Sequence, residues 1–245
     1  MRIAVLSDIH GNLPALEAVL ADIGRRGVDM TVNLGDLLSG PVLPAQTAER
    51  LMALELPTIA GNHERQVLAA DRDAMGPSDR HAAEAITERQ RAWLAALPGT
   101  LWLTESVFLC HATPVSDVAC YLENIEGGAL LAASLAEIDE RTRPCTAPLI
   151  LCGHTHIPRV AYLPTRQVIV NPGSVGIQAY HGHHPEIHRV EIGSPHARYA
   201  IVEQTAAGWM AELLAVPYDW DAAARVAEAN QAPVWAFALR TGFLG

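Results

Sequence analysis

The sequence contains no lysine: all 17 basic residues are arginines, against 27 acidic residues, and the formal net charge is −10 at pH 7. Proteins that hold long nucleic acid neutralise its phosphates with a basic patch or stripe, and no basic run is present here. An acidic chain also gains little at an anionic membrane surface. Long nucleic acid and membranes are therefore not expected partners.

The sequence also lacks an apolar run long enough to span a membrane, and its N-terminal apolar run is too short for a signal peptide. None of the four cysteines forms a C-x-x-C pair, and two of them lie in apolar strand-like runs; they are Cys110, Cys120, Cys145 and Cys152. We therefore expect a reduced, cytoplasmic protein without disulfides.

Half of the residues are hydrophobic, which is enough for a sizeable core. A length of 245 residues allows one large domain or two small ones, and no repeat, low-complexity tract or linker divides the chain. We expect a single α/β domain over residues 1–245, with a helical insert at about 64–98.

The first part of the chain alternates strand-like and helix-like segments. Strands are predicted at Ile3–Leu6, Met30–Leu34 and Thr58–Ala60, and helices at 14–27 and Ala45–Leu54. Such a β-α-β-α-β order indicates a parallel sheet with right-handed crossovers.

The rest of the chain is mostly β in pattern. Two capping boxes, Thr87 to Gln90 and Ser134 to Glu137, mark further helix starts. A helix is also predicted at 219–230, and strands are predicted at Leu101–Leu103, Val107–Cys110, from Leu149, at Val160–Leu163, Val168–Val170, Tyr199–Glu203 and Trp209–Val216.

Polar side chains recur where the apolar strands end. Ligands of open parallel sheets bind at the carboxyl ends of the strands, so five strand ends would bring these side chains to one place. In chain order they are Asp8, His10, Asp36, Asn62, His63, His111, His154 and His156.

Each of these residues has an ordinary structural explanation when taken alone. An Asp after a strand often caps a helix, a Gly-Asp pair often forms a turn, and a single His often hydrogen-bonds within a loop. Only the His154/His156 pair favours a metal by itself, because alternate residues of an extended chain point the same way. Five strand ends that all carry metal-ligand chemistry indicate a site.

The order D-x-H, G-D, G-N-H-E, H and G-H-T-H, from Asp8 to His156, resembles the calcineurin-like metallophosphoesterase family. The strings DIHGNLPALEAVL and VNPGSVG are similar to its small bacterial phosphoesterases and predicted diadenosine tetraphosphatases. The resemblance implies a four-layer α/β/β/α sandwich with a helical insert over the active site.

The resemblance also implies two metal ions. Asp8, His10, Asp36 and His156 would hold the first, and Asp36 would bridge to the second, which Asn62, His111 and His154 would complete. Oxygen and nitrogen ligands without thiolate suit Mn²⁺, Fe, Zn²⁺, Co²⁺ or Ni²⁺, and we favour manganese. No organic cofactor is expected.

The activity so implied is hydrolysis of small phosphodiesters or nucleotide phosphoanhydrides by a metal-bridging hydroxide. His63 is outside the ligand set but beside Asn62, which makes it the candidate general acid for the leaving oxygen. The expected partner is a small phosphorylated substrate such as a nucleotide.

Two features depart from protein Ser/Thr phosphatases of the same fold, which carry G-D-x-V-D-R-G after the second strand. Residues 35–40 read GDLLSG, so the Asp that would orient His63 and the Arg that would clamp a phosphate are both absent. A dianionic monoester loses more from a missing clamp than a monoanionic diester does.

Substrate contacts are predicted in the insert, in the segment 112–145 and in the C-terminal half. The candidates are Arg65, Arg80, Glu123, Gln178 and Tyr180. We interpret the histidine-rich segment His181 to His188 as a loop that would bind metal only adventitiously.

Three alternatives to a small-molecule phosphodiesterase remain open. One is a phosphomonoesterase or protein phosphatase, and another is a non-catalytic metal-binding scaffold, as a retromer subunit of the family is. Such scaffolds usually lose ligand histidines, and none is missing here. A nuclease is disfavoured by the charge.

Overall fold

The computed structural model describes all residues from Met1 to Gly245, and its first sheet contains the N-terminal strand. Strands β1 (Arg2–Leu6) and β2 (Met30–Asn33) run parallel and are connected through helix α1 (Leu13–Ile23). Strand β12 (Ala197–Thr205) lies antiparallel to β1, and β13 (Gly208–Val216) pairs antiparallel with β12. The parallel pairing predicted for the first segments is therefore limited to β1 and β2.

The second sheet has five strands in the order β3-β4-β7-β9-β8. Its three central strands are parallel, and both edge strands are antiparallel to their neighbours. The strands are β3 (Thr100–Thr104), β4 (Val107–Cys110), β7 (Leu149–Leu151), β8 (Arg159–Tyr162) and β9 (Val168–Asn171).

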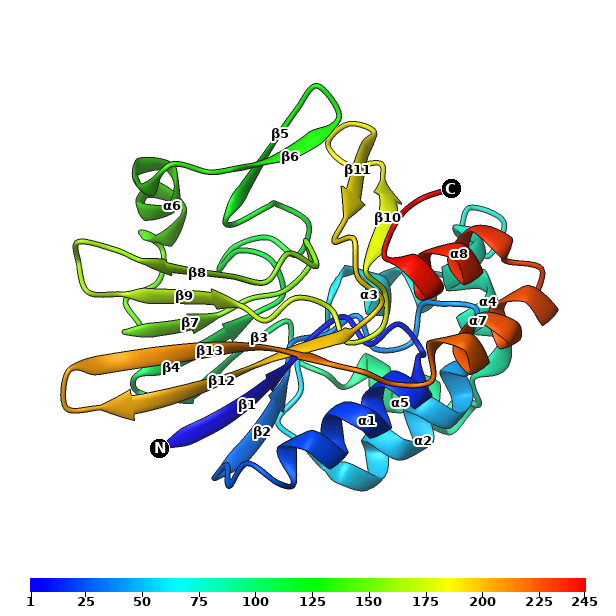
Figure 1. The fold of residues 1–245 in the computed structure, drawn as a ribbon, viewed down its shortest axis with the longest axis horizontal. Helices are drawn as coiled ribbons and strands as arrows, with labels where there is room; N and C mark the ends of the chain where they lie inside the picture. The colour runs from blue at the N-terminus through cyan, green and yellow to red at the C-terminus, as the bar shows by residue number, and fades with distance from the viewer.

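The two sheets pack face to face with helices outside them (Figure 1). Alternate residues of β1 point to opposite faces, so Ile3 and Val5 meet the second sheet while Ala4 and Leu6 meet α1. In β4, Leu109 lies between the sheets, and Phe108 packs outward against the layer of helix α6 (Leu135–Thr142). Strands β1, β4, β7 and β9 are buried on both faces, which confirms the predicted four-layer α/β/β/α fold.

A third, smaller sheet lies at the top of Figure 1, in the order β10-β11-β6-β5. None of its strands was predicted. The segment 112–145 contributes β5 (Glu123–Glu126) and β6 (Ala129–Ala132), and the histidine-rich segment forms β10 (Ala179–Gly182) and β11 (His188–Glu191). The interpretation of the latter as a plain loop is therefore wrong for His181 and His188, which belong to paired strands.

The remaining helices gather on the side of the first sheet and at the carboxyl ends of the strands (Figure 1). Residues 62–98 are helical in three pieces, and both predicted capping boxes are present. The helices are α2 (Pro44–Leu54), α3 (Asn62–Val67), α4 (Pro77–Ala85), α5 (Glu88–Ala95), α7 (Trp220–Ala229) and α8 (Pro233–Thr241).

One predicted strand is not formed. Thr58 makes only an isolated parallel bridge to Asn33, because the chain leaves the sheet at once to begin α3. The bridge still fixes the chain beside the end of β2. Asn62 and His63, which follow it, therefore lie at the same edge of the sheet as they would after a complete strand.

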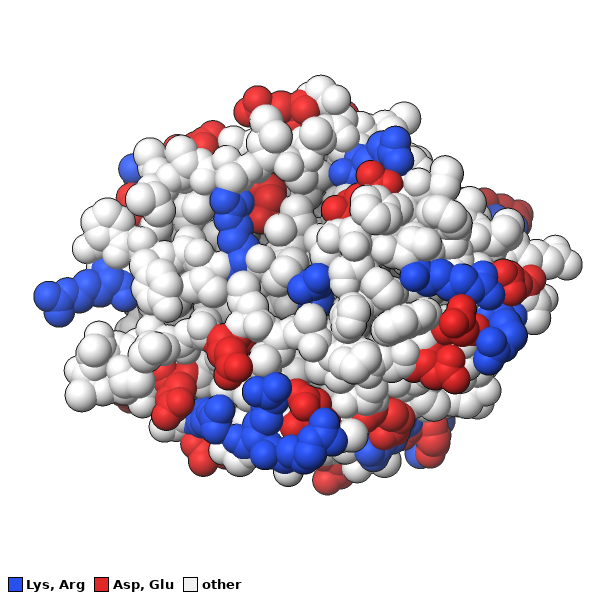
Figure 2. All heavy atoms as spheres, in the orientation of Figure 1, with Lys and Arg blue, Asp and Glu red and all other residues white.

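Charged side chains of both signs are interspersed on the face shown in Figure 2. Arg26 pairs with Asp22 at 2.7 Å, Arg50 pairs with Glu17 at 2.6 Å, and Arg240 pairs with Asp221 at 3.0 Å. These three arginines are thus neutralised locally, and the basic side chains gathered near the lower edge of Figure 2 have acidic ones beside them. No helix has the length and apolarity that crossing a bilayer requires, and all four cysteines are free.

Candidate metal centre

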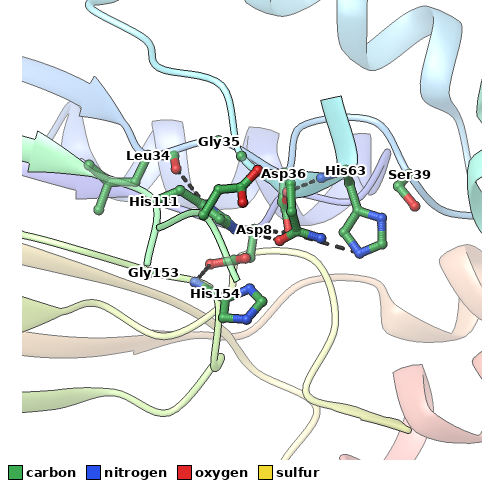
Figure 3. Close-up of polar contacts among 12 residues, drawn as sticks. Asp8, Leu34, Gly35, Asp36, Ser39, His63, His111, Gly153 and His154 are labelled. Atoms are coloured by element: carbon green, nitrogen blue, oxygen red, sulfur yellow. Dashed lines mark hydrogen bonds and ion pairs between the residues drawn. The ribbon is translucent and has the colours of Figure 1, made fainter. Parts of the chain in front are cut away.

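The ends of the strands bring all eight predicted site residues to one region. The loop after β1 carries Asp8 and His10, and the loop after β2 carries Asp36. Helix α3 starts with Asn62 and His63, His111 follows β4, and His154 and His156 follow β7. Figure 3 shows Asp8, Asp36, His111 and His154 converging where these loops meet, with His63 beside them. Seven of the eight are buried or nearly so in the protein interior; His63 retains 29% of its side-chain exposure.

The backbone at this site has an unusual conformation. Eight residues other than glycine have positive φ in the whole chain, and five of them are candidate ligands: Asp8, His10, Asp36, His154 and His156, with φ between 51° and 69°. A left-handed conformation costs a residue with a side chain of order 1–2 kcal/mol, and strain of this kind clusters at functional sites. The concentration of five such residues here points to function rather than to fold.

Glu64 connects the loop after β2 with the start of α3. Its Oε2 accepts the backbone N–H of Asp36 at 2.8 Å and of Gly61 at 2.7 Å, and its Oε1 accepts the N–H of Leu37 at 2.8 Å. The residue is only 2% exposed. Gly61 is required beside it, since a Cβ there would lie 2.3 Å from Asp36 Oδ1. Glu64 therefore fixes the loop that carries Asp36 against the start of α3, where Asn62 lies.

Replacing Glu64 with glutamine is expected to lower the free energy of unfolding of the metal-free protein by about 2 kcal/mol. The amide nitrogen cannot accept, so at least one buried backbone N–H would lose its partner. Urea unfolding followed by circular dichroism measures this, with Glu84→Gln on the exposed face of α4 as the matched control. A loss no larger than that of the control would show that Glu64 does not stabilise the loops.

The first group of candidate ligands consists of Asp8, His10 and His156, whose ligand atoms lie within 4.8 Å of one another. His10 Nδ1 donates to the Ser39 carbonyl at 2.7 Å, and His156 Nδ1 donates to the Ile177 carbonyl at 2.9 Å. A carbonyl only accepts, so both Nδ1 atoms carry a proton and both Nε2 atoms are left to face the site. These two Nε2 atoms lie 3.2 Å apart, and His156 Nε2 is 3.3 Å from Asp8 Oδ1.

The second group consists of Asp36, His111 and His154. His111 Nδ1 donates to the Leu34 carbonyl at 2.8 Å, which leaves its Nε2 at 3.2 Å from both Asp36 Oδ2 and Asn62 Oδ1. His154 donates through Nε2 to the Val118 carbonyl at 3.0 Å and so presents Nδ1. Asn62 joins this group through its amide oxygen.

The protonation chemistry of both groups fits a bound cation. Burial, with a contribution from His156, lowers the pKa of His10 to about 4, and burial with His111 does the same for His154, so these rings are neutral at pH 7. Burial alone would lower the pKa of His111, but Asp36 raises it to about 10. Positive charge is thus favoured next to Asp36. Imidazole nitrogens facing carboxylates, each ring fixed by a backbone carbonyl, are the usual surroundings of a metal ion.

His63 has a partner that the sequence did not reveal. Its Nδ1 lies 2.7 Å from Oδ1 of Asp79, a residue of α4 that is 6% exposed. Burial alone would lower the pKa of His63, but Asp36 and Asp79 raise it to about 9. The prediction that His63 lacks an orienting Asp is wrong, because the helical insert supplies one. In the sequence, Pro77 indicates the start of a helix with Asp79 in its first turn, but not the contact of Asp79 with His63.

Two cavities open beside the candidate ligands. One, of about 450 Å³, extends from His10 and His156 toward Trp235 and is called the Trp235 cavity below. The other, of about 600 Å³, lies between the helical insert and the histidine-rich strands β10 and β11 and is called the β10 cavity. His63, His154 and Tyr180 border both, so the cavities meet at the centre.

Of the five predicted substrate contacts, only Tyr180 lines the two cavities. Its ring packs on His156 at a centroid distance of 4.6 Å. Arg65 pairs with Asp117 at 2.7 Å, and Arg80 bonds backbone carbonyls of the insert. Gln178 and Glu123 are buried in the protein, where they bond Ser174 and lie near Arg159 respectively. These four are occupied with structural contacts.

Comparison with known proteins places these features in a family. Residues 1–194 match the calcineurin-like phosphoesterase superfamily domain. The uncharacterized protein MJ0912 of Methanocaldococcus jannaschii is 27% identical over 95% of this chain and 94% of its own length. The phosphodiesterase YfcE of Escherichia coli strain K12 is 39% identical over 77 residues, which make up 27% of this chain and 42% of that protein.

A solved metallophosphoesterase from Sphaerobacter thermophilus has the same fold, with a TM-score of 0.77 at 24% identity over 99% of this chain and 100% of its own. The family match covers most of the chain and includes both groups of candidate ligands. The chain therefore belongs to the calcineurin-like phosphoesterase superfamily.

Proposed function

We propose that the protein is a phosphohydrolase with a binuclear metal centre that cleaves small phosphodiesters or nucleotide phosphoanhydrides. The observation that carries the proposal is the pair of ligand groups in which imidazole nitrogens and buried carboxylates face one another. The similarity to a phosphodiesterase of Escherichia coli supports the reaction class.

In this proposal Asp8, His10 and His156 hold one ion, Asn62, His111 and His154 hold the second, and Asp36 is shared. Ions held there would supply a Lewis acid for the phosphoryl oxygens and an activated water. Donors of oxygen and nitrogen without thiolate suit Mn²⁺ and the later transition metals, among which we favour Mn²⁺.

The proposed role of His63 follows from its two ring nitrogens. Nδ1 donates to Asp79, which fixes the ring, and this carboxylate raises the pKa of His63 against the lowering by burial, which favours a proton on Nε2. Nε2 lies 4.0 Å from Asp36 Oδ2, at the border of both cavities. A proton held at this point can be passed to the oxygen of a leaving group.

The preference for a diester rests on what surrounds the centre. Neither cavity is lined by an arginine, and the chain has no lysine. The second negative charge of a monoester would therefore have no arginine or lysine to pair with. A diester or an anhydride carries less charge at the reacting phosphorus and loses less.

Diester or anhydride cleavage is expected to exceed phosphopeptide cleavage in kcat/KM by at least about tenfold, since one lost charge-assisted hydrogen bond is worth roughly 1.5–3 kcal/mol. A panel for the Mn²⁺-loaded protein would include bis-p-nitrophenyl phosphate, p-nitrophenyl phosphate, cyclic nucleotides, a dinucleoside tetraphosphate and a phosphopeptide. Efficient dephosphorylation of the peptide with negligible diesterase activity would overturn the proposal in favour of a protein phosphatase. Metal binding without any hydrolysis would favour a scaffold.

Asp79 is expected to act as a positioning residue for His63. Asp79→Asn should lower kcat for a nucleotide ester roughly 10-fold to 100-fold, a part of the 10²–10⁴-fold contributed by a general acid, and should leave KM within about twofold. Turnover of a p-nitrophenyl ester should fall much less. Asp73→Asn, an exposed residue of the same insert, is the control. Equal losses on both ester types would assign Asp79 a purely structural role.

A further inference from the structure

The Trp235 cavity is formed jointly by the metal centre and by the C-terminal helices. On one side lie His10, His156 and Tyr180, and on the other the turn between α7 and α8 with Val234 and Trp235. We propose that this cavity binds an uncharged, planar aromatic arm of the substrate, and that Trp235 determines this specificity. The inference rests on the phosphohydrolase function proposed above and names the substrate class for it.

Trp235 is the aromatic residue that the C-terminal helices contribute to the cavity. Its ring centroid lies 6.0 Å from that of His10, with an interplanar angle of 67°. Its indole edge lies over Gly40, where a Cβ would approach it to 3.2 Å. Most of the residue is covered by the protein, and it lines the cavity. A planar ring that enters the cavity next to His10 would meet the indole and gain stacking energy.

The wall that carries Trp235 is rigidly placed. Small alanines of α7 and α8 pack on Val42, Ile177 and Ala179, so the helix pair closes against the loops of the metal centre. Asn230 donates to the Pro41 carbonyl at 2.9 Å, which connects the turn before α8 to the loop that carries Asp36. Arg240 of α8 bonds Glu228 of α7. A preformed surface of this kind binds a flat ligand without an ordering cost.

The side chains that line the two cavities differ in polarity, and this difference indicates which part of a substrate each cavity would bind. The Trp235 cavity has no charged side chain apart from the candidate ligand Asp36 and its histidine neighbours, and the C-terminal segment contributes mainly Ala232, Pro233, Val234 and Leu244. The β10 cavity is lined by Asp71, Gln66 and four histidines of the β10–β11 segment. A phosphodiester has two arms on one phosphorus. One cavity suits an apolar aromatic arm and the other a polar one.

The size of the Trp235 cavity agrees with such an arm. About 450 Å³ lies within the range of small-ligand sites, roughly 300–1,000 Å³, and admits a nucleoside or a substituted aryl ring. The residues from Gln231 to Leu244 that form its outer wall lie beyond the segment matched by the family domain, residues 1–194. The aromatic subsite is therefore an addition of this chain's C-terminal segment to the common centre.

Equilibrium binding tests this inference independently of turnover. Isothermal titration of the Mn²⁺-loaded protein would compare AMP, phenyl phosphate, ribose 5-phosphate and inorganic phosphate, with phosphate release followed in parallel. AMP and phenyl phosphate share a planar ring that the other two lack, and the difference between them separates a nucleobase from a simple aryl ring. We expect the ring-bearing compounds to bind about tenfold more tightly, as expected for one aromatic stack.

Trp235→Ala should remove this tenfold advantage and leave the affinity for ribose 5-phosphate within about twofold, whereas Trp235→Phe should keep most of it. Phe237→Ala is the matched control, because Phe237 lies on the same helix, is 44% exposed and does not line the cavity. If Trp235→Ala does not fold, the affinities of the wild-type protein for AMP and for ribose 5-phosphate still show whether an aromatic ring is preferred.

Equal affinities of the wild-type protein for AMP and ribose 5-phosphate would overturn the inference, as would a preference that Trp235→Ala retains. A Trp235-dependent preference in a protein that hydrolyses no diester or anhydride would uphold the aromatic subsite and reject the proposed function. Hydrolysis of a diester by a protein without any such preference would support the proposed function and reject the aromatic subsite.

Discussion

Replacing Asp36 with asparagine is expected to reduce bound metal from the two ions per chain proposed above to one or none and to lower kcat/KM at least about 10³-fold. A carboxylate shared by two cations contributes several kcal/mol to binding and charge stabilisation, and 1.36 kcal/mol corresponds to a factor of ten in rate. Elemental analysis after Mn²⁺ reconstitution and dialysis measures the metal, and the diester assay measures the rate.

The substitution is conservative in shape, so its effect can be separated from unfolding. Asp36 Oδ1 accepts the His63 backbone N–H at 2.9 Å, and the amide oxygen of asparagine can do the same. The metal-free protein should therefore still fold, with a lower melting temperature because His111 loses the charge of Asp36, and circular dichroism checks this. Asp73→Asn is again the control. Two ions per chain in Asp36→Asn, with unchanged activity, would contradict the shared-ligand assignment.

The convergence of the candidate residues could be predicted from sequence because each of them follows a recognisable strand end. The runs before Asp8, Asp36, His111 and His154 are short, apolar and followed at once by glycine or polar residues. The parallel strands of such a fold end at the same edge, so order along the chain was enough to bring these residues together. Even the missing third strand did not matter, because the Thr58 bridge holds the following loop in the same place.

Asp79 could not be predicted in the same way. It stands 16 residues after His63 on a separate helix, and only the packing of α4 against α3 brings its carboxylate to 2.7 Å from the ring. Neither residue spacing nor a strand end encodes that contact. The protein phosphatases carry their orienting Asp shortly after the second strand, where residues 35–40 of this chain read GDLLSG. The sequence alone therefore predicted no orienting Asp for His63.

The elements that were missed are short or lack the expected periodicity. The strands from Glu123 to Ala132 are four residues each, and their pairing depends on the third sheet as a whole. Helix α8 has large apolar residues on several faces, with Val234, Trp235 and Phe237 among them, so no single helical stripe stands out. Its start and end were nevertheless signalled by Pro233 and Gly242, the residues preferred at these two positions.

Removing the His63 side chain is expected to slow the chemical step by roughly 10²–10⁴-fold for a nucleotide or alkyl ester without loss of bound metal. His63 lies outside both ligand groups, and its Nε2 is 4.0 Å from the nearest oxygen of Asp36. Both His63→Ala and His63→Asn are informative, because asparagine preserves some polarity at the start of α3 and alanine does not.

The loss should depend on the leaving group. A poor alkoxide needs a proton as its P–O bond breaks, whereas p-nitrophenolate is already a stable anion near neutral pH and needs far less help. The measurement compares kcat for a dinucleoside phosphate and for bis-p-nitrophenyl phosphate in wild type and mutants at equal metal occupancy. Because the ring is held by Asp79 and faces both cavities, the mutants should lose the first activity and largely keep the second. An equal loss on both substrates, or one that follows the metal content, would make His63 a structural residue of the centre and leave protonation of the leaving group to water.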